Sequence, residues 1–201
     1  MISDMKTIHI LLGILLVALF FAWYALRPEV GKDVGILAPT TPAMTEPFSL
    51  VSSAFENNGK IPSRYTCDGS NVSPPLAFSG VPEGTKSLAL IMDDPDVPKA
   101  LRPDGVFVHW VVFNMPPETR EIKEGEPAPG IAGVNGAGAN AYTGPCPPPQ
   151  YEPSEHRYIF RLYALDTPLA LPDGATKGEV LSAMEGHTLG VAELIGRYSR
   201  K

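Results

Sequence analysis

The sequence predicts a mainly β fold, an antiparallel sandwich with a late helical segment, preceded by one N-terminal transmembrane helix. Of the 201 residues, 22 are proline and 19 are glycine, so about a fifth of the chain forms turns readily and a helix bundle is disfavoured. Apolar stretches of strand length recur between these turns. One long uncharged apolar stretch lies near the N-terminus.

The overall composition excludes several classes of protein. Hydrophobic residues make up 44% and charged residues 19%, which is a globular mixture and not that of a disordered or collagen-like chain. The formal net charge is −6 and no run of lysine and arginine occurs, so no nucleic-acid partner is expected. Two cysteines are too few for a disulfide scaffold or a four-thiolate zinc site.

Residues 7–26 contain no Asp, Glu, Lys or Arg, and a helix of this length crosses about 30 Å of hydrocarbon. Lys6 and Arg27 flank the stretch, and Trp23 and Tyr24 stand where an aromatic belt belongs. We therefore expect an uncleaved single-pass membrane anchor, with the large polar body outside the cytoplasm because the tail before the helix is short. A cleaved signal peptide on an exported protein is the alternative, although its apolar core is usually about 7–15 residues long. A buried core helix is the third interpretation.

A linker and the folded body follow this stretch. Residues 28–47 carry four prolines and no helical or strand period, which is typical of a semi-extended linker. The body is expected over residues 48–201. Its first strand is predicted over residues 48–55, where apolar and small polar residues alternate.

Three further strands are predicted in the body. Residues 87–92 form a short apolar run, and residues 106–113 are apolar on both faces apart from His109, which is typical of a central strand buried on both sides. Residues 157–165 alternate, with Tyr158 on the apolar face.

Only residues 176–195 have a helical pattern. Thr176 and Glu179 fit a capping box, with apolar residues at helical spacing behind it. Gly186 and Gly190 interrupt the pattern, so two short helices are expected.

Polar residues beside the predicted strand ends are the candidates for chemistry. Asp94-Pro95-Asp96 follows the apolar run and allows three interpretations: a metal-binding motif of a sugar transferase, solvated loop charge, or a pocket wall in which prolines fix the carboxylates. His109 is either a satisfied core residue or, with His156, a hydrogen-bond donor to a phosphate oxygen. The scattered spacing of the histidines gives no support to a metal site, so no metal or cofactor is expected.

The two cysteines have three interpretations. Cys146 could be a nucleophile, but Pro145 and Pro147 restrict its backbone and no helix N-terminus follows to lower its pKa. A bond between Cys67 and Cys146 is plausible if the body lies outside the cytoplasm. Two free buried thiols are the remaining interpretation.

Six motifs in order resemble the phosphatidylethanolamine-binding protein family, in its bacterial and archaeal Raf-kinase-inhibitor-like branch. The resemblance covers about residues 48–200, essentially the whole body. The motifs are IPSRYTCDGSNVSPPL (61–76), DDPDVP (93–98), VHWVVFNMP (108–116), GPCPP (144–148), HRYIFRLYALD (156–166) and MEGHTLGVAELIGRYSR (184–200).

The resemblance implies a Greek-key β-sandwich with short C-terminal helices and a small anion pocket at one end. The cysteine positions match a pair found in the prokaryotic branch, which favours a disulfide between Cys67 and Cys146. Phe78 stands where the family usually has tryptophan, which implies an altered pocket wall. The positions that match the family's pocket are Asp94, Asp96, Pro98, His109, Gly144, Pro145, His156 and Tyr158.

The function expected from the resemblance is that of a non-catalytic binding protein. Its ligand would be small and phosphorylated or otherwise anionic, such as a phospholipid head group, and its membrane contact would be the N-terminal helix. One alternative is an inhibitor or regulator that docks on a kinase or a protease. The other is a metal- or cysteine-dependent hydrolase, although no G-x-S-x-G, HExxH or P-loop motif occurs.

Overall fold

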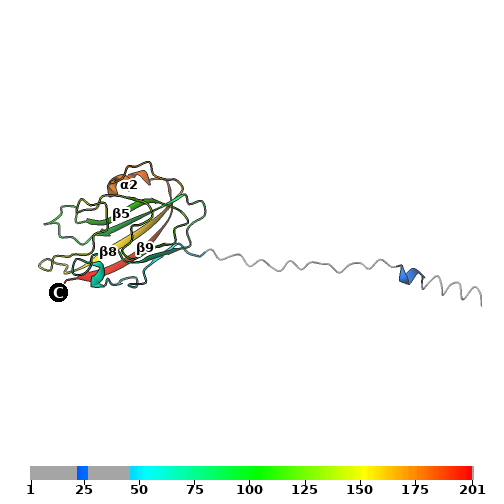
Figure 1. Cartoon of the computed structure of the whole chain (residues 1–201), viewed down its shortest axis with the longest axis horizontal. Coiled ribbons are helices and arrows are strands. Elements are labelled where there is room, and N and C mark those ends of the chain that lie inside the picture. The colour runs from blue at the N-terminus through cyan, green and yellow to red at the C-terminus, as the bar shows by residue number, and fades with distance from the viewer. Residues whose placement is uncertain (1–21, 27–45, 201) are drawn as a thin grey trace, which may run out of the picture. The chain divides into compact units, whose positions relative to one another are not determined.

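The computed structural model describes residues 22–26 and 46–200 of the chain (Figure 1). The chain separates into residues 1–43 and 44–201. In the first unit only residues 22–26 are described, and they form a short helical segment. Across the described residues, no helix is both long enough and apolar enough to cross a membrane.

This finding corrects the predicted transmembrane helix over residues 7–26 and the membrane localisation built on it. The other residues of the predicted helix and most of the predicted linker lie outside the described residues.

The body is a sandwich of two sheets, so the mainly β fold is confirmed. The three-stranded sheet has the order β1 (Ser49–Val51), β3 (Leu76–Ser79) and β6 (Glu121–Ile122). The six-stranded sheet has the order β2 (Gly59–Lys60), β9 (Thr188–Ser199), β8 (Glu155–Leu165), β4 (Ser87–Asp94), β5 (Phe107–Met115) and β7 (Ile131–Ala132). All strand pairs are antiparallel except β2 with β9. A 3₁₀ turn (Ser63–Tyr65) and the helix α2 (Lys177–Ala183) complete the described elements of the body.

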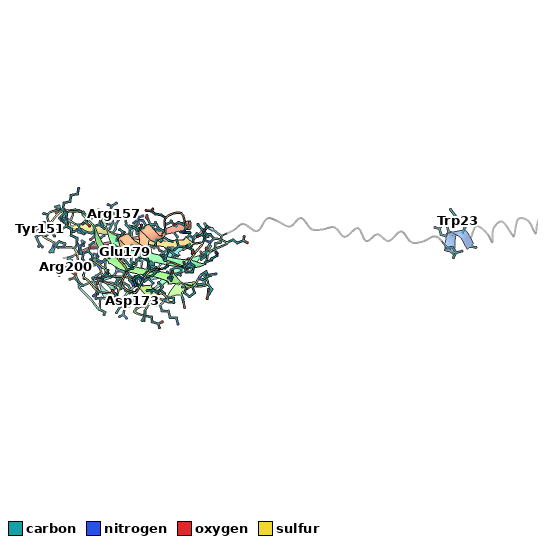
Figure 2. The ribbon with its side chains drawn as sticks, turned by 90° about the horizontal axis from the view of Figure 1, so that it is seen from above. Trp23, Tyr151, Arg157, Asp173, Glu179 and Arg200 are labelled. Carbon is teal, nitrogen blue, oxygen red and sulfur yellow. A yellow bond between two sulfur atoms is a disulfide. The ribbon has the colours of Figure 1, made fainter. Side chains whose placement is uncertain are left out.

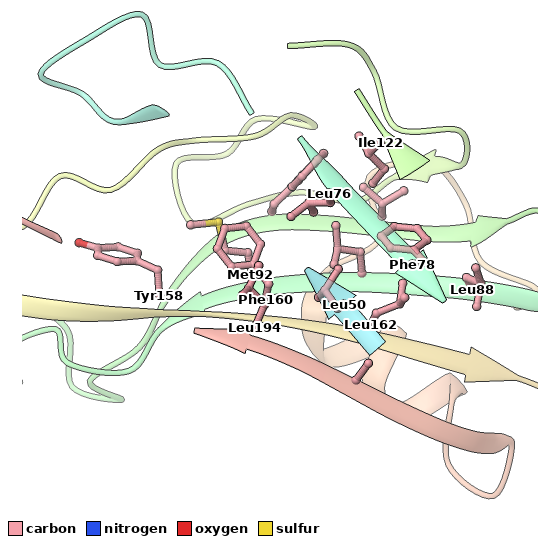
Figure 3. Packing of buried hydrophobic residues seen from close by; sticks show 14 of the residues in the cluster. Leu50, Leu76, Phe78, Leu88, Met92, Ile122, Tyr158, Phe160, Leu162 and Leu194 are labelled. Carbon is pink, nitrogen blue, oxygen red and sulfur yellow. The ribbon is translucent and has the colours of Figure 1, made fainter. Parts of the chain in front are cut away.

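The main hydrophobic core lies between the two sheets. Phe78 of β3 is buried in it, together with Phe160 and Leu162 of β8 (Figure 3). Phe78 therefore belongs to this core and is not among the residues that line the cavity described below.

A second core lies on the other face of the large sheet, where α2 covers it beside β5 (Figure 1). Val180 and Met184 pack there against Ile91 of β4 and Val111 of β5. Every residue of β4 is buried, because both faces of this strand are covered. Burial on both faces is the physical reason for the continuous apolar run at 87–92.

The last part of the chain differs from its prediction. The capping box of Thr176 and Glu179 is present, and it begins α2. The helix ends at Ala183, however, and residues 188–199 form the long strand β9 instead of a second helix. Alternate burial of Ala192, Leu194 and Tyr198 shows the strand period that the helical interpretation overlooked.

Candidate functional site

Three strand ends bring polar side chains to one end of the large sheet. Asp94 is the last residue of β4, and His156 is the second residue of β8. His109 lies in β5. Since β4 pairs with both β5 and β8, its last residue lies between the two strands that carry the histidines.

The position of His109 is set by an irregularity in the pairing of β5 with β4. Met92 pairs with Trp110 and Asp93 pairs with Val108, so His109 is an extra residue with no partner in the register. A bulge of this kind redirects the extra side chain and is common beside functional sites. It explains how one polar residue is accommodated in an otherwise apolar strand.

Asp94 and His156 form a buried ion pair. Nδ1 of His156 donates to Oδ2 of Asp94 over 2.6 Å, and the two residues are 1% and 4% exposed. Burial lowers the pKa of His156, but the hydrogen bond and charge of Asp94 outweigh burial, and the pKa is raised above its ordinary value. The ring therefore favours the charged form. The Pro153 carbonyl lies near the ring and also favours the charge, but it makes no hydrogen bond to Nε2, which is buried and has no hydrogen-bond partner.

His109 has the opposite protonation preference. Burial lowers its pKa, although the Thr143 carbonyl and the charge of Asp94 act against this. Its Nδ1 lies 2.6 Å from the Thr143 carbonyl, which can only accept, so Nδ1 carries the proton. In the neutral ring Nε2 is therefore an acceptor.

Tyr158 lies beside both imidazoles. Its ring meets His109 edge-on at 5.1 Å and stacks with His156 at 6.5 Å between centroids. Figure 3 shows Tyr158 at one end of the core, with its hydroxyl pointing away from Met92 and Phe160. Burial and the nearby Asp94 raise the pKa of Tyr158, and its buried hydroxyl has no hydrogen-bond partner.

A cavity of about 330 Å³ opens at these residues. Of the predicted site residues, Asp94, His109, Gly144 and His156 line it. The other lining residues are Val97, Leu101, Arg102, Phe107, Thr143, Cys146, Pro147 and Pro148.

Asp96, another predicted site residue, does not line the cavity. Both of its carboxylate oxygens accept from the Arg157 guanidinium, at 2.6 and 2.9 Å, and the Arg157 amide also donates to it. These bonds with Arg157, against the effect of burial, lower the pKa of Asp96. Figure 2 shows Arg157 among the surface side chains. Asp96 therefore fixes the acidic loop to the start of β8.

Pro98 and Pro145 act through their backbones and do not line the cavity. The Pro98 carbonyl accepts from the amides of Leu101 and Arg102, which turns the loop so that both residues reach the cavity. The Pro145 carbonyl accepts from the Cys67 amide.

The loop that carries Gly144 is tied to residues 65–71. Cys67 and Cys146 are joined in a disulfide bond, with a Cα–Cα distance of 5.4 Å. The Gly144 amide donates to the Asn71 side chain over 2.8 Å. A Cβ at Gly144 would collide with the Tyr65 carbonyl, so only glycine fits this close approach. Both cysteines are used in the bond, so the predicted cysteine-hydrolase alternative lacks its nucleophile.

The sequence interpretation missed several lining residues, above all Arg102 and Phe107. Arg102 Nη2 donates to the Gly136 carbonyl over 2.8 Å, and its guanidinium lies 4.8 Å from the centre of the Phe107 ring. Phe107 is the first residue of β5 and could have been identified from its spacing of two from His109. Arg102 lies in an irregular loop and gives no periodic signal.

The cavity combines a few donors with apolar walls. His156 Nε2 and the guanidinium of Arg102 are donors, and His109 Nε2 is an acceptor. Asp94 is neutralised by His156, so Arg102 leaves the lining with a net positive charge. Among the described residues, no group of three histidine, cysteine or acidic side chains is arranged to hold a metal ion. Such a cavity can hold a small anion.

Comparison with known proteins agrees with this fold. A sequence profile of the phosphatidylethanolamine-binding protein family matches residues 51–199. A UPF0098 protein of Methanothermobacter thermautotrophicus is 52% identical over 159 residues, covering 76% of this chain and 99% of its own length. A UPF0098 protein of Chlamydia muridarum is 46% identical over 153 residues, covering 76% of this chain and 99% of its own.

Solved structures show the same architecture. A phosphatidylethanolamine-binding protein homologue from Chlamydia trachomatis superimposes with a TM-score of 0.73 at 44% identity, over 77% of this chain and 98% of its own. Escherichia coli YbcL, described as a member of the mammalian family, gives a TM-score of 0.68 at 28% identity, over 77% of this chain and 99% of its own. The chain therefore belongs to the phosphatidylethanolamine-binding protein family, in the branch that archaea and bacteria share.

Proposed function

We propose that this protein is a non-catalytic binding protein whose cavity holds a phosphate-containing or similar small anion. The observation that carries the proposal is the Nε2 atom of His156. It belongs to a ring that favours the charged form, it is buried, and it has no partner. A buried donor without a partner costs about 1–3 kcal/mol, and an anionic oxygen would remove this cost with a charge-assisted hydrogen bond.

The family membership supports a phosphoryl group as the anion. The matching family and the Chlamydia trachomatis homologue are both described as phosphatidylethanolamine-binding. A phosphoryl group offers several anionic oxygens, and when protonated it also offers a donor for the acceptor nitrogen of His109. The proposed ligand class is therefore a phosphate or its ester.

The arrangement of the lining supports binding without turnover. Thr143 is the lining residue with an aliphatic hydroxyl, and that hydroxyl accepts from the Asn135 side chain over 2.8 Å. His109 contacts the backbone carbonyl of Thr143 and not this hydroxyl. A nucleophile needs a base within hydrogen-bond reach; among the described residues, the hydrogen-bond partner of this hydroxyl is an amide, which is not a base.

Titration of the full-length protein with inorganic phosphate by calorimetry tests the proposal. We expect weak binding at neutral pH, with a Kd on the order of micromolar to millimolar, as a few charge-assisted bonds provide. The substitution His156→Ala should weaken binding about tenfold or more, which corresponds to about 1.4 kcal/mol.

His187→Ala is the matched control. His187 also pairs with an aspartate, Asp166 at 2.8 Å, but it is exposed and does not line the cavity. Affinity should be unchanged in this variant. Equal phosphate affinity in the His156→Ala variant and the unsubstituted protein would place the binding elsewhere.

A further inference from the structure

The loop between β4 and β5 presents one cation to the cavity. Arg102 is half-buried and lines the cavity. The Gly136 carbonyl accepts from its Nη2, and the Phe107 ring lies under its guanidinium. Arginine has five N–H donors, so most of them remain for a ligand. Within the described part of the chain, no carboxylate forms an ion pair with Arg102.

The carboxylates near the cavity are already used. Asp94 accepts from His156 with Oδ2 and from the Asp96 amide with Oδ1. Asp96 is paired with Arg157 and does not line the cavity. Among the described residues, the lining therefore offers no unpaired carboxylate to an ammonium group on the ligand.

Apolar side chains form much of the remaining wall. Val97, Leu101 and Phe107 lie on the β4–β5 loop side, and Pro147 and Pro148 come from the loop before β8. These residues can contact a hydrocarbon substituent on the anion, and contact of this kind is favourable in proportion to the apolar area removed from water.

We infer that Arg102 makes the cavity selective for phosphate monoesters that carry an uncharged substituent, and against those that carry an ammonium group. This inference rests on the proposed anion binding. The guanidinium donates to the phosphoryl oxygens, while it repels a cation placed near it. Phosphoethanolamine is then a poorer ligand than an uncharged ester of the same size, although the family takes its name from ethanolamine lipids.

A matched pair of ligands tests the inference. Propyl phosphate and phosphoethanolamine have the same length, and they differ in a methyl group in place of an ammonium group. Calorimetry with the full-length protein, at a pH low enough that both phosphates are monoanions, should give a Kd about tenfold lower for propyl phosphate.

The variant Arg102→Gln removes the charge and keeps a side chain that can donate hydrogen bonds. It should weaken propyl phosphate binding about tenfold and change phosphoethanolamine binding by less than about threefold, so the ratio of the two affinities approaches one. Arg120→Gln is the matched control, because Arg120 is exposed, donates to backbone carbonyls and does not line the cavity. That variant has the same change in net charge and should keep the full preference.

The ratio of the propyl phosphate affinity to the phosphoethanolamine affinity distinguishes a loss of selectivity from general damage to the cavity, because damage would weaken both ligands equally. If Arg102→Gln weakens both ligands equally, or if the unsubstituted protein binds phosphoethanolamine as tightly as propyl phosphate, the inference is wrong. In either case the proposed function still stands if propyl phosphate binding depends on His156. If neither ligand binds, or if His156→Ala has no effect on propyl phosphate, the proposed function fails as well.

A phosphate monoester can come from a lipid or from a soluble metabolite. Dihexanoyl phosphatidate and propyl phosphate share the monoester group, so both should show the same loss in Arg102→Gln. The ligand with the lower Kd, dihexanoyl phosphatidate or propyl phosphate, indicates whether the natural monoester is a lipid or a soluble metabolite. If neither depends on Arg102, the inference is overturned.

Discussion

Two histidines in one cavity hold opposite protonation preferences, and the cause lies in their immediate partners. The Asp94 carboxylate is hydrogen-bonded to His156 and favours the imidazolium. His109 has a carbonyl as its Nδ1 partner, so burial dominates and its pKa is lowered. The cavity therefore holds one ring that favours the charged, donating form and one that favours the neutral form with an acceptor nitrogen, a combination that suits a partly protonated oxyanion.

The protonation of His156 makes anion affinity dependent on pH. The charged ring is the binding form, so affinity is lost as pH rises through the pKa of His156, which lies above the ordinary value of 6.5. We expect the affinity for sulfate, whose own charge does not change in this range, to fall by about tenfold across this transition. Calorimetry over the pH series measures it.

The variant Asp94→Asn is the control for this transition. Without the carboxylate, the pKa of His156 should fall, and the loss of affinity should move to lower pH. NMR of the His156 ring nitrogens reports the titration directly. A transition at or below 6.5 in the unsubstituted protein would contradict the assignment, because His109 would then be the titrating group.

Among individual residues, the buried polar ones were easier to identify from the sequence than the residues at the rim of the cavity. His109 and His156 stand out because an imidazole in an apolar strand needs a polar partner. Pro98 and Pro145 were predicted as ligand-binding positions; in the structure they lie outside the cavity lining, and their backbone carbonyls hold neighbouring residues. Arg102 could not be predicted, since its place depends on a loop whose shape leaves no period in the sequence.

Among the elements, the strands buried on both faces were the easiest to predict and the last strand was the hardest. Residues 87–92 lie within β4, and residues 107–113 of the second predicted stretch lie within β5, where both faces are covered. Before β9, the capping box of Thr176 and Glu179 favoured a helical interpretation that was extended over residues 176–195. The alternation of burial that marks β9 as a strand begins only at Ala192, near the end of the stretch predicted as helical.

The position of the loop that carries Gly144 depends on the close approach of Gly144 to the Tyr65 carbonyl. In Gly144→Ala the new Cβ collides with the Tyr65 carbonyl, so the loop must shift, at a cost of about 1–3 kcal/mol. Because the loop also carries the Thr143 carbonyl that orients His109, phosphate affinity should decrease as well. Urea unfolding and calorimetry measure the two effects.

Gly178→Ala in α2 is the matched control. Its Cβ would have Thr176 Oγ1 at 3.9 Å as its near neighbour, and alanine favours helix over glycine by about 0.5–1 kcal/mol. This variant should be more stable than the unsubstituted protein and should bind phosphate unchanged. Equal stability of the Gly144→Ala variant and the unsubstituted protein would show that the loop adapts freely.

In the molecule as a whole, one sheet separates two cores, and the site lies where its strands end. Consecutive residues of β4 serve the two faces: Asp94 meets His156 at the cavity, while Asp93 pairs with Lys177 of α2 at 2.6 Å. In Figure 2, Tyr151 and Arg200 lie at one end of the domain, where the loop after Pro148 approaches the end of β9. The rigid sandwich thus holds the loops that form the cavity.

The disulfide bond acts on the whole chain because it closes a loop between positions 79 residues apart. In the double variant Cys67→Ser, Cys146→Ser, the free energy of unfolding should decrease by about 2–4 kcal/mol, mainly through the greater freedom of the unfolded chain. Urea unfolding of both proteins measures the difference.

Phosphate affinity in the same double variant should stay within about threefold of the unsubstituted protein. The Gly144 amide, the Pro145 carbonyl and the Tyr142 hydroxyl still hold this loop to residues 65–71. A large loss of affinity would show that the disulfide, and not these bonds, positions the cavity wall.

The mainly β architecture was predictable at this scale, because turn residues and strand periods recur along the body. The pairing of strands was not, since β4 pairs with β8, which lies several strands later in the chain. The predicted N-terminal membrane helix was wrong for the described residues, where no helix is long and apolar enough to span a bilayer. The apolar composition of residues 7–26 was therefore not sufficient evidence for a membrane-spanning helix.

The central claim is that an anion binds at Nε2 of His156, and a crystal structure of the protein grown with propyl phosphate tests it most directly. We predict a phosphoryl oxygen within hydrogen-bond distance of that nitrogen, about 2.7–2.9 Å, with the ester group against Phe107 and Leu101. A phosphate bound elsewhere, with water or no ligand at His156 Nε2, would contradict the account.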